Sequence, residues 1–480
     1  MSEATAKKDK NLLYFVIYCI IAAMGWIIPP IDPITTEGMH LIGVFVAAIV
    51  GWSFTSEVWP SFMTLLLLPF TGLVDLNGFL AISWGSDTIL FLSMHLVYVA
   101  FLDSSGTTSY VAAFLMTRKF LVGHPWRLIF MIFMMAWLLS TFCGNFAGML
   151  IPWGFIYKIC DVLGYKPFDK FANLMIFGVA VMGALSLSAV PWANNALVIL
   201  NAYMATTGDQ VNYLHYLSYS IPVGIFSILG FMLICKFIFR LDVSKLKNLD
   251  PNVFNSKDLK LTVDNKIALI SLLVLIIVLV VPSLLPAENI IRVVSNNLGL
   301  GLKAALIFLV LGLIRIDGRQ VFKFGELATK GVPWNMVMMT AGILSFVSLL
   351  GSDATGISAF LGKMLTPLFN DSSVIFFFLL TLVITVFLTN FMINMVVAVI
   401  MISATLPIAA SLGVDSLQIV YLITVSCTIA FMLPAASAAS CVLFANTQWV
   451  RAKDVYKYSV PTIIMMALIA LVWNFILFLF

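Results

Sequence analysis

The sequence predicts an all-α polytopic membrane protein, with about eleven transmembrane helices and two re-entrant helical hairpins arranged in two inverted repeats. Three observations lead to this fold class. Hydrophobic residues make up 62% of the 480-residue chain and charged residues only 10%, whereas soluble domains carry about 25% charged residues. Apolar segments long enough to cross a bilayer recur along the chain. Two longer apolar segments are interrupted in the middle by similar polar motifs.

The composition also excludes several classes of protein. A chain so poor in charge cannot cover its surface in water, which argues against a soluble enzyme, a disordered chain and a nucleic-acid-binding module. No metal-ligand spacing, phosphate-binding loop or catalytic-triad signature occurs, so we expect no enzyme, no resident metal and no ATP-driven transport. The cysteines form no CxxC pair and are expected to pack as small apolar side chains. They are Cys19, Cys143, Cys160, Cys235, Cys427 and Cys441.

Most of the predicted spans follow directly from apolar segments. A transmembrane helix needs about 20 predominantly apolar residues. The first segment ends at Pro29-Pro30 without a cleavage pattern, so we expect a retained membrane helix rather than a signal peptide. The predicted spans are residues 11–28, 39–55, 58–74, 86–103, 172–200, 218–240, 266–286, 303–316, 334–350, 417–445 and 460–480.

Two further segments, 126–157 and 372–411, are too long for one span and break at STFCGNFAG (140–148) and TNFMIN (389–394). Lys and Arg accumulate in cytoplasmic loops. If both segments are hairpins and the N-terminus is cytoplasmic, all but three of the 26 basic residues lie inside. Thirteen spans, the alternative, would place the two ends of each hairpin on opposite sides of the membrane. We therefore expect an inward hairpin and, flanked by Asp371 and Asp415, an outward one, in a multi-pass protein of the plasma (inner) membrane.

The two halves of the chain repeat a motif. LSTFCGN (139–145) aligns with LTNFMIN (388–394), which pairs Asn145 with Asn394. Each copy is followed by a proline-interrupted apolar helix, SLSAVPWANN (186–195) and FMLPAASAAS (431–440). Proline breaks the helical hydrogen-bond ladder, and broken helices in matching positions of inverted halves indicate the binding site of a transporter.

The hairpin tips offer the chemistry of ion and anion binding. A helix start presents free amides to an anion, and a helix end with Ser, Thr and Asn oxygens suits a small cation such as sodium. Ser140 with Asn145, and Thr389 with Asn394, supply such oxygens. A single membrane Asn would more simply hold two helices together, but the repeated pair favours a binding role.

Other polar residues leave alternatives open. Asn194 and Asn195 beside Pro191 are unusual in a purely packing helix, whereas Ser437 and Ser440 are weaker candidates. His95 could carry protons, although a packing histidine is the simpler interpretation. Asp103, in the same predicted span, is expected near its wet cytoplasmic end.

Four segments carry a resemblance to a known family. They are EGMHLIGVFVAAIVGWSFTSEVWP (37–60), GHPWRLIFMIFMMAWLLSTF (123–142), ELATKGVPWNMVMMTAGILSF (326–346) and CTIAFMLPAASAASCVLFANTQWVRAKDVYKYSVP (427–461). Together they resemble the divalent-anion/sodium symporter family, whose members carry dicarboxylates, citrate or sulfate. The resemblance covers most of the chain.

The resemblance implies a homodimer with an elevator mechanism, in which a transport domain slides against a scaffold domain. Residues 1–122 and 266–363 would form the scaffold domain. Residues 123–240, with the inward hairpin, and 364–480, with the outward hairpin, would form the transport domain. The polar stretch 241–265 is expected to be a cytoplasmic linker between the two halves.

The resemblance also implies a set of site residues. Each hairpin tip of the family carries a Ser-Asn-Thr triplet, which reads Gly144-Asn145-Phe146 and Ile393-Asn394-Met395 in this chain. The expected ion-binding residues are Ser140, Gly144, Asn145, Val190, Thr389, Asn394 and Ala436. The expected substrate-binding residues are Asn145, Phe146, Trp192, Asn194, Asn394, Met395 and Ser437.

We therefore expect a secondary active transporter that moves a small di- or tricarboxylate-like or sulfate-like anion, with sodium as the coupling ion and no organic cofactor. Because Phe146 and Met395 replace two threonines, we expect a less hydrophilic anion or a different mode of binding. The alternatives are a sodium-independent anion exchanger, a proton-coupled carrier and a channel. A membrane-embedded enzyme is the least favoured.

Overall fold

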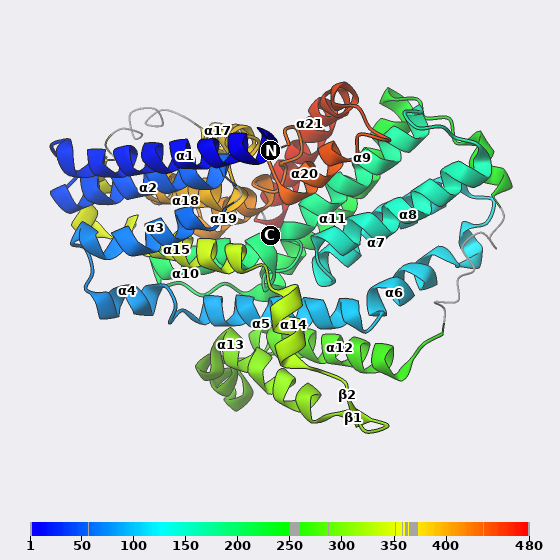
Figure 1. Cartoon of the computed structure of the whole chain (residues 1–480), viewed down its shortest axis with the longest axis horizontal. Coiled ribbons are helices and arrows are strands. Elements are labelled where there is room, and N and C mark those ends of the chain that lie inside the picture. Colours follow the sequence, from blue (N-terminus) through cyan, green and yellow to red (C-terminus); the bar gives the residue numbers. More distant parts are fainter. Residues whose placement is uncertain are drawn as a thin grey trace. The chain divides into compact units, whose positions relative to one another are not determined.

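A computed structural model describes residues 2–55, 57–249, 260–286, 288–350, 352–357, 359–360, 363, 373–434 and 436–478. These residues form helices almost throughout (Figure 1). The strands among them are the two-residue pair β1 (Arg315–Ile316) and β2 (Arg319–Gln320), which are antiparallel with Arg315 opposite Gln320. The predicted all-α class is confirmed.

The chain divides into two compact units, each described here by itself. Unit 1 takes Met1–Leu90, Val198–Val211 and Pro333–Cys427, and unit 2 takes Phe91–Leu197, Asn212–Val332 and Thr428–Phe480. The predicted scaffold and transport domains stay a prediction. Residues 250–259 of the predicted linker, and Asp371 at the second hairpin, lie outside the described residues.

Unit 1 contains two long N-terminal helices that approach each other closely. A Cβ atom at Gly25 would lie 2.9 Å from Cα of Gly43, so only glycine allows this contact between α1 and α2. The hydroxyl of Thr35 caps α2 by accepting from the Gly38 amide at 3.0 Å, which fixes where the helix begins. The elements wholly in unit 1 are α1 (Ser2–Ile27), α2 (Thr36–Phe54), α3 (Trp59–Leu67), η1 (Leu68–Thr71), α4 (Leu76–Ile82), α15 (Trp334–Leu350), η8 (Asp353–Thr355), α17 (Val374–Thr389), α18 (Asn394–Ser411) and α19 (Ser416–Ser426).

Unit 2 is built around α9 (Lys170–Leu185), which is buried from Phe171 to Leu185. A helix that is apolar on every face either lies in a protein core or spans a membrane, and the neighbours of α9 cover almost all of it. Gly178 lets Phe133 and Phe231 approach its backbone, because a Cβ there would lie 2.4 Å from the Phe231 ring. The other elements are α6 (Thr107–Met116), η2 (Lys119–Leu121), α7 (Pro125–Phe142), α8 (Asn145–Leu163), η3 (Ser186–Ser188), α11 (Tyr213–Leu233), η4 (Ile234–Ile238), η5 (Ser244–Asn248), α12 (Val263–Leu284), α13 (Ile290–Leu313), α14 (Phe324–Gly331), α20 (Ala438–Ala445) and α21 (Ala452–Leu477).

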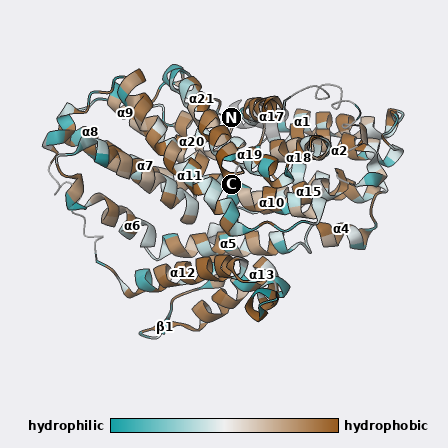
Figure 2. Cartoon of the chain, turned by 180° about the vertical axis from the view of Figure 1, so that it is seen from behind, coloured by the Kyte–Doolittle hydropathy of each residue, from teal (hydrophilic) through white to brown (hydrophobic). Residues whose placement is uncertain are grey.

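Helices α5 (Asp87–Ser104) and α10 (Asn194–Thr207) contribute residues to both units. Among the described residues, nine helices are long and apolar enough to cross a membrane, and shorter apolar helices accompany them. Figure 2 shows hydrophobic residues along the helices and hydrophilic ones at many helix ends and connections. Several elements differ from prediction. Helix α13 begins at Ile290 rather than near residue 303, and α21 begins at Ala452 rather than near residue 460. Helices α4, α6 and α14 are additional short helices.

Both long apolar segments are helical hairpins that break where the sequence predicts. Helix α7 ends at Phe142 and α8 begins at Asn145, and Gly144 between them has φ 90°. Helix α17 ends at Thr389 and α18 begins at Asn394. The side of the membrane to which each hairpin opens stays a prediction.

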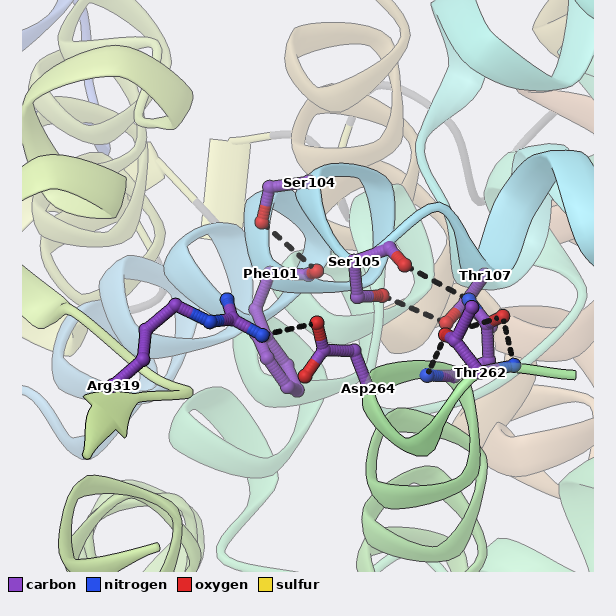
Figure 3. A network of polar contacts seen from close by, with 8 residues as sticks. Phe101, Ser104, Ser105, Thr107, Thr262, Asp264 and Arg319 are labelled. Atoms are coloured by element: carbon purple, nitrogen blue, oxygen red, sulfur yellow. Dashed lines mark hydrogen bonds and ion pairs between the residues drawn. The ribbon is translucent and has the colours of Figure 1, made fainter. Parts of the chain in front are cut away.

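A polar network in unit 2 joins the start of α12 to the break between α5 and α6. The Asn265 side chain donates to the Ser105 carbonyl at 2.8 Å and completes a capping box with Thr262. Figure 3 shows the Arg319 guanidinium directed at the Asp264 carboxylate, 2.6 Å away. These contacts fix α12 against a turn far away in the sequence.

Candidate functional site

The first hairpin tip is tied to the end of α9 through Asn145. Its side-chain NH₂ donates to the Gly183 carbonyl at 3.0 Å, and the Ser186 hydroxyl donates to the same carbonyl at 2.7 Å. The Oδ1 atom of Asn145 is buried and has no hydrogen-bond partner among the described residues. The side-chain NH₂ group of Asn145 is thus engaged in a hydrogen bond within the protein, while its side-chain oxygen has no partner among the described residues.

A second open oxygen lies at the same tip. Ser140, in the last turn of α7, is fully buried and its Oγ atom has no hydrogen-bond partner among the described residues. The facing residue on α8 is Gly148, where a Cβ would lie 2.2 Å from Ser140 Oγ. An unsatisfied buried polar atom costs about 1–3 kcal/mol. The two oxygens belong to residues five positions apart, on either side of the helix break. Because both carry partial negative charge and lack a donor, a cation bound between them would satisfy both.

Gly144 gives the tip its shape. Its backbone (φ 90°, ψ 149°) is in a region that only glycine occupies readily. The Gly144 carbonyl accepts from the Gly148 amide at 3.0 Å, which is the first hydrogen bond of α8. The same carbonyl immediately precedes Asn145 in the chain. Phe146, the next residue after Asn145, is 57% exposed.

The break after α9 is held by side chains of α11. The Tyr216 hydroxyl donates to the Ser188 carbonyl at 2.7 Å, and the Ser220 hydroxyl donates to the Ala189 carbonyl at 2.8 Å. The carbonyl of Val190, a predicted ion-binding residue, accepts only a long 3.4 Å bond from the Ala193 amide among the backbone contacts. Helix α10 begins at Asn194, which adopts φ 51°.

Two predicted pocket residues near these breaks are engaged with the protein itself. Trp192 is 2% exposed and its ring lies 6.2 Å from that of Tyr213. The hydroxyl of Ser437 donates to the Ala430 carbonyl at 2.7 Å and accepts from the Ser440 amide, so it caps α20. The neighbouring Ala436 is buried. The hydroxyls of Ser188 and Thr428 lie 3.2 Å apart and join the two broken segments within unit 2.

The second hairpin tip, in unit 1, has a related arrangement. The buried Thr389 hydroxyl lies 3.0 Å from Asn394 Oδ1 and 2.6 Å from the Cys427 carbonyl, to which it donates. Cys427 follows α19 directly. In both repeats, therefore, a polar side chain of the hairpin binds a carbonyl at the end of the next long helix. Met395, in contrast to Phe146, is only 3% exposed.

The structure adds residues that sequence reasoning did not single out. Gly183 supplies the carbonyl at the first tip, and Ser186 shares it. In unit 1 the Oγ atom of Ser426, at the end of α19, is buried without a hydrogen-bond partner among the described residues. Ser186 opens the proline-interrupted motif at 186–195, and Ser426 lies five residues before the start of its counterpart at 431–440. A search for hydroxyls at the ends of the preceding helices would have found both. The described residues hold no group of three His, Cys, Asp or Glu side chains that could bind a metal.

His95 is a separate polar site in unit 2. It is buried, its ring stacks on Phe91 at 5.7 Å, and its Nδ1 atom has no hydrogen-bond partner among the described residues. The small cavity beside it measures about 10 Å³ and is lined by Tyr98, Leu275 and Phe308 among others. That volume holds at most one water molecule.

Comparison with known proteins identifies the family. The sequence model described as "Citrate transporter" matches residues 44–428, which is most of the chain. The chain belongs to the citrate transporter family. This confirms the predicted resemblance, and with the apolar helices it shows an integral, multi-pass membrane protein. The family is one of transporters, in agreement with the expectation that the chain is not an enzyme.

Curated relatives match over shorter stretches. The Na(+)/dicarboxylate cotransporter 3 of Rattus norvegicus is 32% identical over 130 residues, which are 27% of this chain and 21% of that protein. The Homo sapiens protein of the same name is 32% identical over 119 residues, 25% of this chain and 19% of the relative. The Sodium-dependent low-affinity dicarboxylate transporter 1 of Caenorhabditis elegans is 30% identical over 116 residues, 24% and 19% of the two chains. The matches thus span about a fifth of the relatives' length.

A solved structure shares the fold. The Alcanivorax borkumensis YdaH transporter, described as having an unusual topology, aligns with a TM-score of 0.54 over 84% of this chain and 89% of its own. At 17% sequence identity the likeness is one of fold alone.

Proposed function

We propose that this protein is a secondary active transporter that moves a small di- or tricarboxylate-like or sulfate-like anion together with sodium. The observation that carries the proposal is the pair of buried, unpartnered oxygens of Ser140 and Asn145 at the first hairpin tip. The names of the curated relatives support sodium and dicarboxylate as the transported species.

Sodium fits the first tip because its donors are neutral oxygens. The C-terminal end of a helix carries partial negative charge, and α9 ends beside the tip, where Gly183 already binds Asn145. Ser140 Oγ and Asn145 Oδ1 would turn to the ion, as carbonyls and broken-helix ends do in other transporters. The Asn145 NH₂ would hold its oxygen in place through Gly183.

A second ion would bind at the tip in unit 1. Thr389 Oγ1 and Asn394 Oδ1 lie 3.0 Å apart, and Ser426 offers a further buried oxygen without a described partner. Because Thr389 donates its proton to the Cys427 carbonyl, the oxygen lone pairs of its hydroxyl are available to a cation.

The anion would bind to backbone amides rather than to the Asn145 side chain. That NH₂ is occupied by Gly183, whereas the first turns of α8 and α18 present free amides and the positive ends of their dipoles. The exposed Phe146 ring adds apolar surface where the related family carries a threonine. These features favour an anion with an apolar part over a fully hydrated one such as sulfate.

The wider proposal includes the remaining expectations from the resemblance. The protein would form a homodimer in the plasma (inner) membrane with a cytoplasmic N-terminus. Its transport domain, residues 123–240 and 364–480, would move as an elevator against the scaffold domain, residues 1–122 and 266–363. The internal repeat of the two hairpins supports this arrangement, because inverted repeats underlie alternating access.

Uptake into proteoliposomes tests the proposal. The purified full chain would be offered labelled citrate, succinate and sulfate, with and without an inward sodium gradient. We expect sodium-dependent accumulation of at least one carboxylate, which at limiting sodium is strongly reduced by Ser140→Ala and Asn145→Ala and unchanged by Asn297→Ala, an exposed asparagine of α13. Uptake that is the same with and without the sodium gradient, or that neither tip substitution reduces, would contradict sodium symport.

A second candidate function, proton-coupled transport, rests on His95. Its buried Nδ1 atom without a described partner could accept a proton next to the small cavity. A pH gradient that drives uptake in sodium-free buffer, and fails to do so in His95→Gln, would favour this candidate over sodium symport.

A further inference from the structure

Helices α11 and α21 pack against each other in unit 2 and run in opposite directions. The Tyr219 hydroxyl, in the second turn of α11, donates to the Ala470 carbonyl near the end of α21 at 3.1 Å. At the other end of the pair, the ring of Phe239 lies 4.9 Å from that of Tyr458. Phe239 directly follows the π-helical turn η4, which extends α11. The end of α11 therefore adjoins the start of α21.

Both helices carry an exposed apolar stripe. Tyr213–Ile238 and Ala452–Leu477 are each long and apolar enough to cross a membrane, so open apolar side chains on them are expected to face acyl chains. The exposed side chains of α21 recur every fourth residue, which places them on one face; they are Val460, Ile464, Leu468 and Val472, between 48% and 55% exposed. Those of α11 and η4 are Phe226, Leu229, Leu233 and Phe237.

Basic residues continue these stripes at the end where the two helices meet. Lys457 and Lys453 precede Val460 by about one and two turns of α21, and Lys236 and Arg240 follow the stripe of α11. All four basic side chains are exposed, and none of them forms a salt bridge with another described residue. A change from apolar to basic along one helix face is typical of the boundary between acyl chains and headgroups.

The backbone is unusual where α11 reaches this boundary. The Phe239 amide donates to the carbonyl of Ile234, five residues earlier, at 2.9 Å, which forms the π-helical turn. Such turns are rare and are frequent at functional sites. Arg240 then adopts φ 47°, a left-handed conformation that glycine adopts more readily. The helix thus ends on a bend that carries a basic side chain where glycine would be favoured.

We propose that the shared end of α11 and α21 binds an anionic phospholipid, with the phosphate at Lys236 and Lys457 and the acyl chains along the two apolar stripes. Residues 234–248 and 451–460 contain seven basic and two acidic residues, so the local charge favours an anionic headgroup over a zwitterionic one. The acidic residues are also engaged, since Asp242 accepts from the Ser244 amide and Asp454 accepts from the Asn173 side chain.

The same charge disfavours a second copy of the chain at this place. Two copies inserted in the same orientation are related by a two-fold axis along the membrane normal. Contact through this face would bring the basic end of one copy against that of the other, and like charges oppose such an interface. A lipid instead supplies both an anion and flexible apolar chains.

Native mass spectrometry of the full chain in detergent would test this proposal. The protein would be titrated with phosphatidylglycerol or phosphatidylcholine carrying the same acyl chains. We expect phosphatidylglycerol to be retained at least about tenfold better. Lys236→Gln and Lys457→Gln should each lower that preference about fivefold, as expected for one basic residue, and the double variant should lose it. Lys457→Arg should preserve the preference, because it keeps the charge.

A photoactivatable phosphatidylglycerol would locate the lipid. With a diazirine in its acyl chain, irradiation and digestion should place the label on residues 233–237 and 460–464, and glycerol phosphate should not displace it. Lys266→Gln, an exposed lysine at the start of α12, serves as the matched control and should behave as the wild type in both measurements. Melting curves would show that each variant is folded.

Three results would overturn the proposal. Equal retention of the two lipids by the wild type would remove the role of charge. An unchanged preference in the double variant, or a label confined to other helices, would place the lipid elsewhere. An intermolecular disulfide through Ile464→Cys in lipid-free detergent, absent from the wild type, would show that a second copy covers this face. None of these measurements depends on transport, so failure here would leave the proposed function untouched.

Discussion

The side chain of Asn145 donates a hydrogen bond of 3.0 Å to the carbonyl of Gly183, 38 residues further along the chain. This bond orients the asparagine at the first hairpin tip and leaves its oxygen unpartnered among the described residues. In unit 1 the side chain of Thr389, which the repeat pairs with Ser140 rather than with Asn145, donates to the carbonyl of Cys427, also 38 residues further along the chain. Each tip is thus tied to the end of a later helix, although from a different position of the motif, and these two contacts motivate the first predictions.

Asn145 is expected to have two roles, as the donor to the Gly183 carbonyl and as an oxygen ligand of sodium, and different substitutions should separate them. Asn145→Asp keeps an oxygen ligand but loses the donor to Gly183, whereas Asn145→Ala loses both. We expect the sodium concentration for half-maximal uptake to rise about tenfold or more in Asn145→Ala, because lost interactions with a charge cost about 1.5–3 kcal/mol. Sodium titrations of uptake would measure this. An unchanged half-maximal sodium concentration in Asn145→Ala would reduce the residue to a contact between helices.

Thr389 should tolerate serine but not valine. Thr389→Ser keeps the hydroxyl that joins Asn394 and Cys427, and we expect near-normal uptake. Thr389→Val has almost the same shape but leaves the Cys427 carbonyl without its donor and removes one proposed ligand oxygen, which should cost about 1–3 kcal/mol and suppress uptake. Thermal unfolding and uptake would be measured on both variants. Equal behaviour of the serine and valine forms would contradict a role for the hydroxyl.

Gly148→Ala should destabilise the first hairpin. The new Cβ would lie 2.2 Å from Ser140 in the facing helix, so the two arms must separate, at a cost of about 1–3 kcal/mol. Gly154→Ala on the same helix is the matched control, because nothing lies within 4 Å of its Cβ position. Scanning fluorimetry should show a lower melting temperature for the first variant only.

Phe146→Thr tests the inference about the anion. The side chain is exposed, so the change in stability should stay within about 0.5 kcal/mol. If the added hydroxyl meets the substrate, KM for a dicarboxylate should fall, by about tenfold for a hydrogen bond to a charged group. Initial uptake rates against substrate concentration would measure this, and an unchanged KM would place Phe146 away from the anion.

The polar network at the start of α12 should respond unequally to substitution. Asn265→Ala removes the bond to Ser105 and the capping box, which we expect to cost about 1–2 kcal/mol. Arg319→Gln breaks only a largely exposed ion pair with Asp264, worth less than about 1 kcal/mol. Thermal unfolding in low and high salt would separate the two, since only the ion pair is screened. A larger loss in Arg319→Gln would contradict this ranking.

Several features of the fold could be predicted because their causes are local. Helix spans follow from hydropathy, and the break at Gly144 follows from a Gly-Asn pair between apolar runs. The predicted start of α13, near residue 303, is wrong. Asn289 caps the helix, which begins at Ile290, but the basic and polar residues Arg292, Asn296 and Asn297 interrupt the apolar pattern of its first turns. The apolar pattern therefore indicated a later start.

Site residues were predicted less completely. Asn145, Ser140, Thr389 and Asn394 share hairpin tips as expected, and their roles as ligands stay a proposal. Trp192 is buried against Tyr213, and the Ser437 hydroxyl caps α20. No local pattern distinguishes a buried tryptophan from one that faces a pocket, because burial depends on which helix packs against it.

The sequence by itself determined that the chain spans a membrane in many helices, where two of its hairpins break and which polar residues stand at the breaks. Each of these depends on the chemistry of neighbouring residues. The tertiary structure alone decided that Gly183 and Cys427 offer the carbonyls that orient the tips, and that the basic end of α11 adjoins the basic start of α21. These pairings join distant segments, and only the packing of the folded helices brings such atoms within reach.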